Sequence, residues 1–437
     1  MKNGFLQNLL ARMSYRSLSI VAGISAFSAY TCMYAFRKAF TAATFSHAAF
    51  FGVDYKVLLV IAQVIGYMLS KFYGIKYIGA LDPAKRGRSV LLLIGIAWVA
   101  LLGFALTPAP YNIIFLLING FPLGMIWGLV FGYLEGRKST EFTAAVLSVS
   151  LIFASGFVKT IGRTLIESFA ISEYWMPFAT GLCFVPFLLI SVWVLENVPP
   201  PTDDDKRFRI ERKPMSAPER AAFLKRFLPG LILSVFTYVL LTIMRDLRDN
   251  FEVEIWAYLG ISDKHIYSAN DTVISLLVLM AISLLVLVRN NLRAFSIIHF
   301  FILSGCAMII ISTWLFNLSV IGPVVWMGAC GLGLYLGYIP YNAVFFERLI
   351  ATFRYKSNVG FIMYVSDSAG YLGSVSVLLF KEFSHSEQNW GEFFKTTAWI
   401  VAILGGLGAL LSLIYFRAQA FRRSEKDRPE VLQLTST

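Results

Sequence analysis

The chain has 437 residues, of which 57% are hydrophobic and only 15% are charged, and its formal net charge is +12. Soluble proteins have roughly 45–50% apolar and about 25% charged residues, so this composition excludes an ordinary soluble domain and predicts a membrane protein with several spans. The excess of basic residues is explained by cytoplasmic loops rich in Lys and Arg. We therefore expect the protein to lie in a lipid bilayer and not to bind nucleic acid.

The chain opens with a short segment, 1–16, whose apolar residues recur at helical spacing. Its apolar face carries Phe5, Leu6, Leu9, Leu10 and Met13, and Lys2, Arg12 and Arg16 supply charge. This pattern predicts a short amphipathic helix on the membrane surface, with a frayed terminus as the alternative.

Twelve apolar runs follow, each long enough to cross a bilayer core of about 30 Å as a helix. The predicted spans are 17–40, 54–76, 89–107, 110–133, 142–167, 174–195, 227–248, 267–288, 295–316, 321–346, 357–380 and 396–417. One polar segment, 196–226, separates six spans from six, and its prolines and mixed charges predict a solvated linker. We therefore predict an N-terminal half at 1–195, a linker at 196–226, a C-terminal half at 227–417 and a tail at 418–437.

Lys and Arg alternate between the connections. They gather before the first span, after the second, fourth, eighth and tenth spans, and in the tail, whereas the other connections carry few. By the positive-inside rule, both termini and the linker should be cytoplasmic. The four histidines lack metal-ligand spacing and no phosphate-binding loop is present, so we expect no cofactor, no metal and no enzyme activity.

The first and seventh spans share a pattern in which an arginine follows a tyrosine by seven residues. Tyr30 precedes Arg37, and Tyr238 precedes Arg245. A cation inside a span normally faces the bundle interior or a watery cavity. The alternatives are that Arg37 extends to the lipid headgroups and that Arg245 pairs with Asp249 one turn later.

Several short motifs occur in order along most of the chain. They are R-K-A-F at 37–40, Y-M-L-S-K-F at 67–72, G-M-I-W at 124–127, an arginine at 245 and G-Y-L-G at 370–373. On these motifs the chain resembles the major facilitator superfamily, and within it the organophosphate:phosphate antiporters that carry glycerol 3-phosphate or hexose phosphates. The loop at 79–88 departs from that family's spacing, and Lys159 and Arg163 occupy the fifth span where the branch has a histidine.

The resemblance implies an all-α integral membrane fold of two six-helix halves. It also implies a secondary active transporter that exchanges an organic phosphate for phosphate by alternating access, with Arg37 and Arg245 on the phosphate. Guanidinium groups suit that role because they stay charged and donate paired hydrogen bonds to a tetrahedral anion. We expect a monomer in the bacterial inner membrane.

Other polar residues inside spans complete the candidate site. Lys71 lies one turn beyond Tyr67, and could line the cavity or reach the headgroups. Lys159 needs water or a counterion, and Asp367 could neutralise Lys71 or Lys159, or carry a proton. Four tyrosines could give hydroxyls to a solute, although packing is the alternative for each: Tyr30, Tyr34, Tyr67 and Tyr238.

Two other functions remain open from the sequence. One is a proton-coupled carrier of a different small solute, with Asp367 as the proton site. The other is a sensor that does not transport and uses the linker and basic tail to contact a partner. An integral membrane enzyme is disfavoured because no catalytic constellation stands out.

Overall fold

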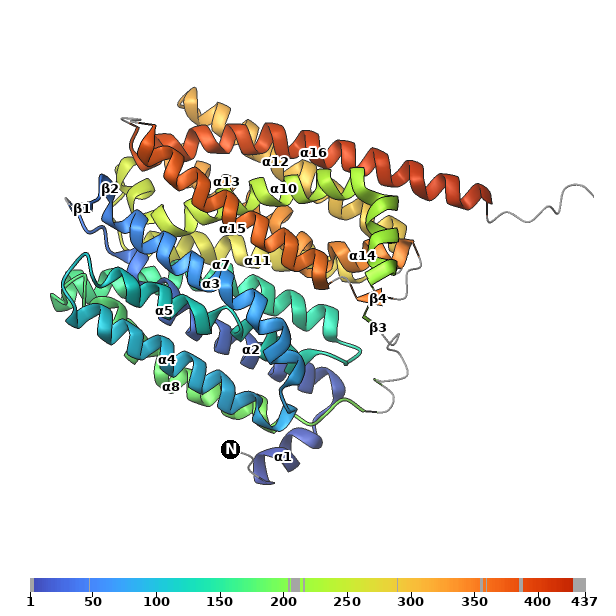
Figure 1. Cartoon of the computed structure of the whole chain (residues 1–437), viewed down its shortest axis with the longest axis horizontal. Coiled ribbons are helices and arrows are strands. Elements are labelled where there is room, and N and C mark those ends of the chain that lie inside the picture. Colours follow the sequence, from blue (N-terminus) through green and yellow to red (C-terminus); the bar gives the residue numbers. More distant parts are fainter. Residues whose placement is uncertain are drawn as a thin grey trace, which may run out of the picture.

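The computed structural model describes residues 4–46, 48–202, 205, 213–214, 217–288, 290–353, 357–358, 360–384 and 388–426. These residues form a bundle of helices in two groups (Figure 1). The first group, blue to green in Figure 1, contains α1 (Gly4–Ala11), α2 (Tyr15–Lys38), α3 (Tyr55–Ala80), α4 (Arg86–Leu106), α5 (Ile113–Leu123), α6 (Ile126–Leu134), α7 (Thr140–Phe169) and α8 (Met176–Asn197).

The second group runs from green to red in the same view. It contains α10 (Ala217–Tyr258), α11 (His265–Val286), α12 (Asn291–Asn317), α13 (Pro323–Pro340), α14 (Phe346–Thr352), α15 (Gly360–Phe383) and α16 (Trp390–Lys426). Short 3-10 turns lie at η1 (Ala39–Ala42) and η2 (Pro83–Lys85), and η3 (Tyr341–Phe345) is a π-helix.

Two pairs of very short strands mark opposite ends of the bundle (Figure 1). Strands β1 (Ala49–Phe50) and β2 (Val53–Asp54) form an antiparallel hairpin, and we call that end the hairpin face. Strands β3 (Lys213–Pro214) and β4 (Ser357–Asn358) pair in parallel at the other end, which we call the terminal face. Helices α2 and α10 begin at the terminal face and run toward the hairpin face.

Eleven segments of the described chain are long and apolar enough to cross a membrane. The remaining long helix, α15, has 24 residues. Its bounds overlap the twelfth expected span at 357–380, so every predicted span corresponds to a helix. The prediction of an all-α integral membrane protein is confirmed.

Several element boundaries differ from the predictions; the helix of the last expected span, for example, continues to Lys426 in the expected tail 418–437. The expected fourth span is broken into α5 and α6 at Gly124–Met125, just after Pro122, whose ring removes a backbone donor. Helix α10 begins at Ala217, so the end of the expected linker 196–226 is helical. Beyond the expected limit at 248, Phe251 (φ −119°, ψ 22°) interrupts the helix, and a second helical stretch continues to Tyr258. Asp249 and Glu252, on either side of this interruption, are buried beside cations and do not end the span.

Helix α1 forms as expected within the predicted amphipathic segment. Phe5 and Leu9 are exposed on it and only Leu10 is buried. Exposed apolar side chains on a short terminal helix suit an interfacial position in the bilayer, which stays a prediction.

The side of the membrane that the terminal face occupies is tested by labelling. We expect Ser216→Cys, in a Cys183→Ser background, to give no signal with an impermeant thiol reagent added outside intact cells. Ser216 itself lies outside the described residues, but the loop charges predict that the linker is cytoplasmic. Strong labelling from outside would reverse the predicted topology.

The two groups of helices touch mainly along two pairs, α7 with α11 and α3 with α15. At the first pair the backbones approach closely, because a Cβ on Gly156 of α7 would lie 2.2 Å from the backbone oxygen of Tyr267 in α11. Glycine is needed where backbones come this close.

We expect Gly156→Ala to lower the melting temperature of the purified protein, because the added methyl group separates α7 from α11. Gly95→Ala is the matched control, since nothing lies within 4 Å of a Cβ at that position of α4. Equal melting temperatures for the two variants would show that the close packing at Gly156 adds nothing to stability.

Candidate functional site

The site is built at the end of α2, where the helix leaves its last carbonyls without partners inside the helix. Gln63 of α3 donates a hydrogen bond of 2.6 Å to the carbonyl of Arg37, and Asn119 of α5 donates one of 3.0 Å to the carbonyl of Phe36. Gln63 also donates to Asn119 at 2.8 Å. These buried amides fix the end of α2 and with it the backbone that carries Arg37.

Arg37 is buried inside the bundle, with only 5% of its surface exposed, and does not extend to the headgroups. Its guanidinium carbon lies 3.8 Å from the ring centroid of Tyr67 and 5.8 Å from that of Tyr34. Its Nε atom is buried without a hydrogen-bond partner. Among the described residues, no carboxylate lies within 4.0 Å of this guanidinium, so its charge is held by aromatic faces alone.

Arg245 approaches the same region from the other half. Its Nη2 lies 2.6 Å from Oδ1 of Asp246, and Nη1 donates to the hydroxyl of Tyr338. Its guanidinium carbon is 5.6 Å from the ring centroid of Tyr371, which packs edge-on against Tyr67 at 5.4 Å. The structure thus brings Arg37 and Arg245 to the two sides of one tyrosine pair.

Arg245 does not pair with Asp249, which was the alternative that the spacing offered. Asp249 instead lies 3.3 Å from Nζ of Lys38 and 3.2 Å from Nζ of Lys159, and it accepts a hydrogen bond from Ser155. The two lysines belong to α2 and α7 of the first half. Asp249 is therefore paired with these two lysines, whereas Arg245 is paired with Asp246, the next residue in the sequence.

Lys71 and Asp367 meet across the halves, with Nζ and Oδ2 separated by 3.5 Å. The hydroxyl of Tyr238 donates to Oδ1 of Asp367 at 2.5 Å. Of the two partners considered for Asp367, the structure therefore places Lys71 beside it, and Lys159 pairs elsewhere. Lys71 also lies 5.1 Å from the Tyr67 ring, so it faces the same tyrosines as Arg37.

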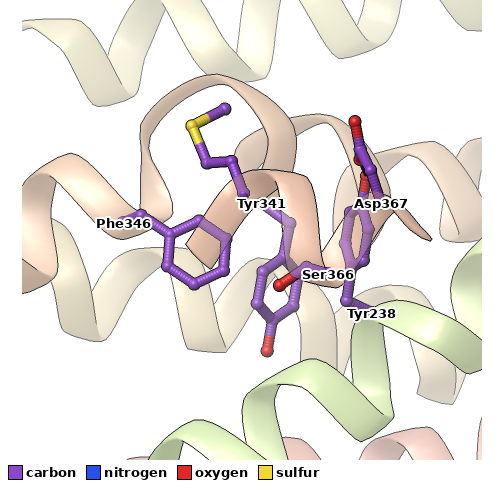
Figure 2. A pocket seen from close by; sticks show the side chains of 6 residues that line it. Tyr238, Tyr341, Phe346, Ser366 and Asp367 are labelled. Atoms are coloured by element: carbon purple, nitrogen blue, oxygen red, sulfur yellow. Dashed lines mark hydrogen bonds between the residues drawn. The ribbon is translucent and has the colours of Figure 1, made fainter. Parts of the chain in front are cut away.

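The space beside Asp367 is closed, and the side chains around it leave no cavity large enough for a water molecule. Figure 2 shows Tyr238 and Asp367 side by side at its edge, with Tyr341 between them and Phe346. Ligand sites usually have volumes of roughly 300–1,000 Å³, so no solute fits at this point in this structure. Its lining residues are Tyr238, Tyr341, Phe346, Met363, Ser366 and Asp367.

Tyr30 and Tyr34 of α2 are both buried, with ring centroids 5.8 Å apart. Tyr238 is buried too and stacks on Tyr338 at 5.4 Å. The four tyrosines chosen from the sequence are thus all inside the bundle, but only Tyr34 and Tyr67 lie next to Arg37. Tyr371, which packs against Tyr67, belongs to the same group of rings. From the sequence it was named only as part of the G-Y-L-G motif and not as a site residue.

Sequence reasoning missed a row of paired charges toward the hairpin face. Lys159 lies 3.0 Å from Glu252, Arg248 lies 2.5 Å from Asp271 of α11, and all four side chains are fully buried. Near this row, Lys56 of α3 lies 2.5 Å from Glu254. The charged run at 245–254 could have indicated these pairs, because its residues 245, 248, 249 and 252 recur at helical spacing and so share one face of the helix.

Pairs between lysines of the first half and acids of α10 join the two halves near the hairpin face. Acids of α10 hold Lys38, Lys56 and Lys159, which belong to α2, α3 and α7. At the terminal face, Arg348 and Glu141 form a partly exposed pair across the halves, with 3.1 Å between Nη2 and Oε2. Within the described ranges, no three His, Cys, Asp or Glu side chains gather as they would around a metal ion.

The bundle has the fold of the major facilitator superfamily of membrane transporters. It matches the crystal structure of a D-xylose-proton symporter with a TM-score of 0.59, over 91% of this chain and 97% of that chain, at 13% sequence identity. The predicted fold is therefore confirmed, and at this identity the likeness concerns the fold alone.

The chain belongs to a family of unknown function, DUF5690, whose sequence profile matches residues 39–419. None of the curated proteins compared with it matches. The organophosphate antiporter branch, suggested by the short motifs, stays a prediction.

Proposed function

We propose that this protein is a secondary active transporter that moves a small anionic solute across the membrane by alternating access. The observation that carries the proposal is Arg37, a buried cation without a carboxylate partner in the described chain, facing tyrosines from both halves. An anion held there would contact both halves, and so could favour their rearrangement.

Within that class, the motifs at 37–40 and 67–72 favour an organic phosphate exchanged for phosphate. Lys71 and Arg245 lie around the same tyrosine pair as Arg37, and each is paired with an acid of its own. We place the protein in the bacterial inner membrane as a monomer, with the terminal face in the cytoplasm.

A proton-coupled carrier is the second candidate. It is favoured by Asp367, which accepts a hydrogen bond from Tyr238 and lies 3.5 Å from Lys71. A carboxylate between a cation and a hydroxyl at the junction of the halves is a suitable place to take up and release a proton. Uptake driven by an imposed proton gradient, lost in Asp367→Asn, would favour this candidate over exchange.

The test of the main proposal uses purified full-length protein, first in binding assays and then in liposomes. The panel contains phosphate esters, sugar carboxylates and uncharged sugars. We expect an anion to bind, and Arg37→Lys to weaken it by about tenfold or more, because lysine keeps the charge but loses the paired donors. Arg163→Gln is the control, since Arg163 forms an exposed pair with Glu167 away from the tyrosines.

The outcomes separate the readings. Anion binding that is unchanged in Arg37→Lys and in Arg37→Gln would contradict a site at Arg37. Arg37-dependent binding without uptake or exchange in liposomes would identify a sensor built on the transporter fold.

A further inference from the structure

The buried charges around the junction of the halves can be counted. Seven basic side chains form this cluster, and six of them lie within 4.0 Å of a carboxylate, as follows: Lys38, Lys56, Lys71, Lys159, Arg245 and Arg248. The carboxylates are also six: Asp246, Asp249, Glu252, Glu254, Asp271 and Asp367. Counted over these ion pairs, which include the partly exposed Glu254 and Asp367, the described cluster has one more cation than carboxylates, and Arg37 is the cation without a carboxylate within 4.0 Å.

A buried charge is costly unless an opposite charge or hydrogen bonds compensate it. The six pairs compensate one another, whereas Arg37 has only the faces of Tyr67 and Tyr34. One negative charge from a solute would bring the cluster to neutrality. A second negative charge on the solute would lie in the same region without a free cation of the described cluster to pair with it.

The position of Asp246 also disfavours a second negative charge on the solute. Its carboxylate lies 2.6 Å from Arg245, and one of its oxygens is buried without a hydrogen-bond partner. A second anionic group that reached for Arg245 would meet this carboxylate first. Like charges placed together in this way reject a ligand.

We infer that the solute binds with a single net negative charge, its anionic group on Arg37 and its body among Tyr34, Tyr67 and Tyr371. This inference rests on the proposed function and narrows its substrate class to monoanions. Carboxylates qualify, as do sulfate esters, whereas a phosphate ester is accepted only in its singly protonated form. Asp246 is the residue that sets this limit.

The test compares matched solutes that differ by one charge, with purified full-length protein at about pH 8, where phosphate monoesters with a second pKa of about 6 are doubly charged. The first pair is gluconate and glucarate, and the second is glucose 6-sulfate and glucose 6-phosphate. We expect the singly charged member of a pair to bind at least about tenfold more tightly, and Arg37→Gln to remove the difference. Comparing the two pairs also shows whether the site prefers a carboxylate or a tetrahedral anionic group such as a sulfate or phosphate ester.

A variant of the protein gives a second, independent measurement. Asp246→Asn frees Arg245 and raises the surplus charge of the cluster to two, so the preference should shift toward the doubly charged member by about tenfold or more. Glu167→Gln changes the net charge of the chain equally but lies on the partly exposed Arg163 pair, and should leave the preference as in the wild type.

Each result has one meaning. If the doubly charged member binds as tightly as its partner in an Arg37-dependent way, the limit to one charge is wrong and the anion transporter proposal stands. The same holds if Asp246→Asn leaves the preference unchanged. If no charged member binds in an Arg37-dependent way, the proposed function and this inference both fail.

Discussion

Arg248→Gln is expected to lower the free energy of unfolding by about 3–5 kcal/mol, the usual cost of removing one partner from a buried ion pair. Arg248 and Asp271 are fully buried, and Nη2 and Oδ1 are 2.5 Å apart. Removing the guanidinium leaves the carboxylate of Asp271 buried between α10 and α11 without its cation. Denaturant unfolding of the purified protein measures the loss.

Two further variants make this prediction specific. Arg248→Met combined with Asp271→Leu removes both charges and should recover most of the stability, because neither group is then left unpaired. Arg163→Gln breaks the partly exposed pair with Glu167 and should cost less than about 1 kcal/mol. A double variant as unstable as Arg248→Gln alone would show that these side chains stabilise the bundle by some means other than their charge pair.

Arg37→Gln is expected to have the opposite effect on the empty protein and to raise the free energy of unfolding by about 1–3 kcal/mol. The reason is that Arg37 is buried with an Nε atom that has no partner, and a buried group of this kind costs about that much. The same substitution should abolish anion binding. A gain in stability with a loss of function is typical of residues that are kept for binding.

The measurement is thermal and denaturant unfolding of the ligand-free protein beside the wild type. Tyr67→Leu serves as a control, because it removes the aromatic face under the guanidinium and should destabilise the empty protein. If Arg37→Gln is as destabilising as Arg248→Gln, Arg37 has a compensating partner and the surplus charge does not exist.

Hydropathy and loop charge predicted the helices well, because both act locally along the chain. At the end of the seventh span, charge was the cause of the difference. The expected seventh span stopped at 248 because the acids that follow usually end a span, but Asp249 and Glu252 are buried by pairing with Lys38 and Lys159. Those lysines lie far away in the sequence, and no local pattern could connect them.

The candidate site was predicted in part for the same reason. A cation inside a span can be recognised from the sequence, so Arg37, Arg245 and Lys71 were found. Which acid neutralises which cation depends on how helices of the two halves face each other. The sequence could therefore not distinguish Arg245, paired with Asp246, from Arg37, which is left without an acid.

The surplus charge of Arg37 also has an electrical consequence. In the proposed alternating-access cycle, the empty protein moves one positive charge across part of the membrane field when it changes the side from which Arg37 is reached. Moving one full charge across a potential of 100 mV changes the free energy by about 2.3 kcal/mol. With a monoanion bound, the same movement carries no net charge. Voltage should therefore govern the return of the empty carrier and not the loaded step, and the transient currents of reconstituted protein should disappear in Arg37→Gln.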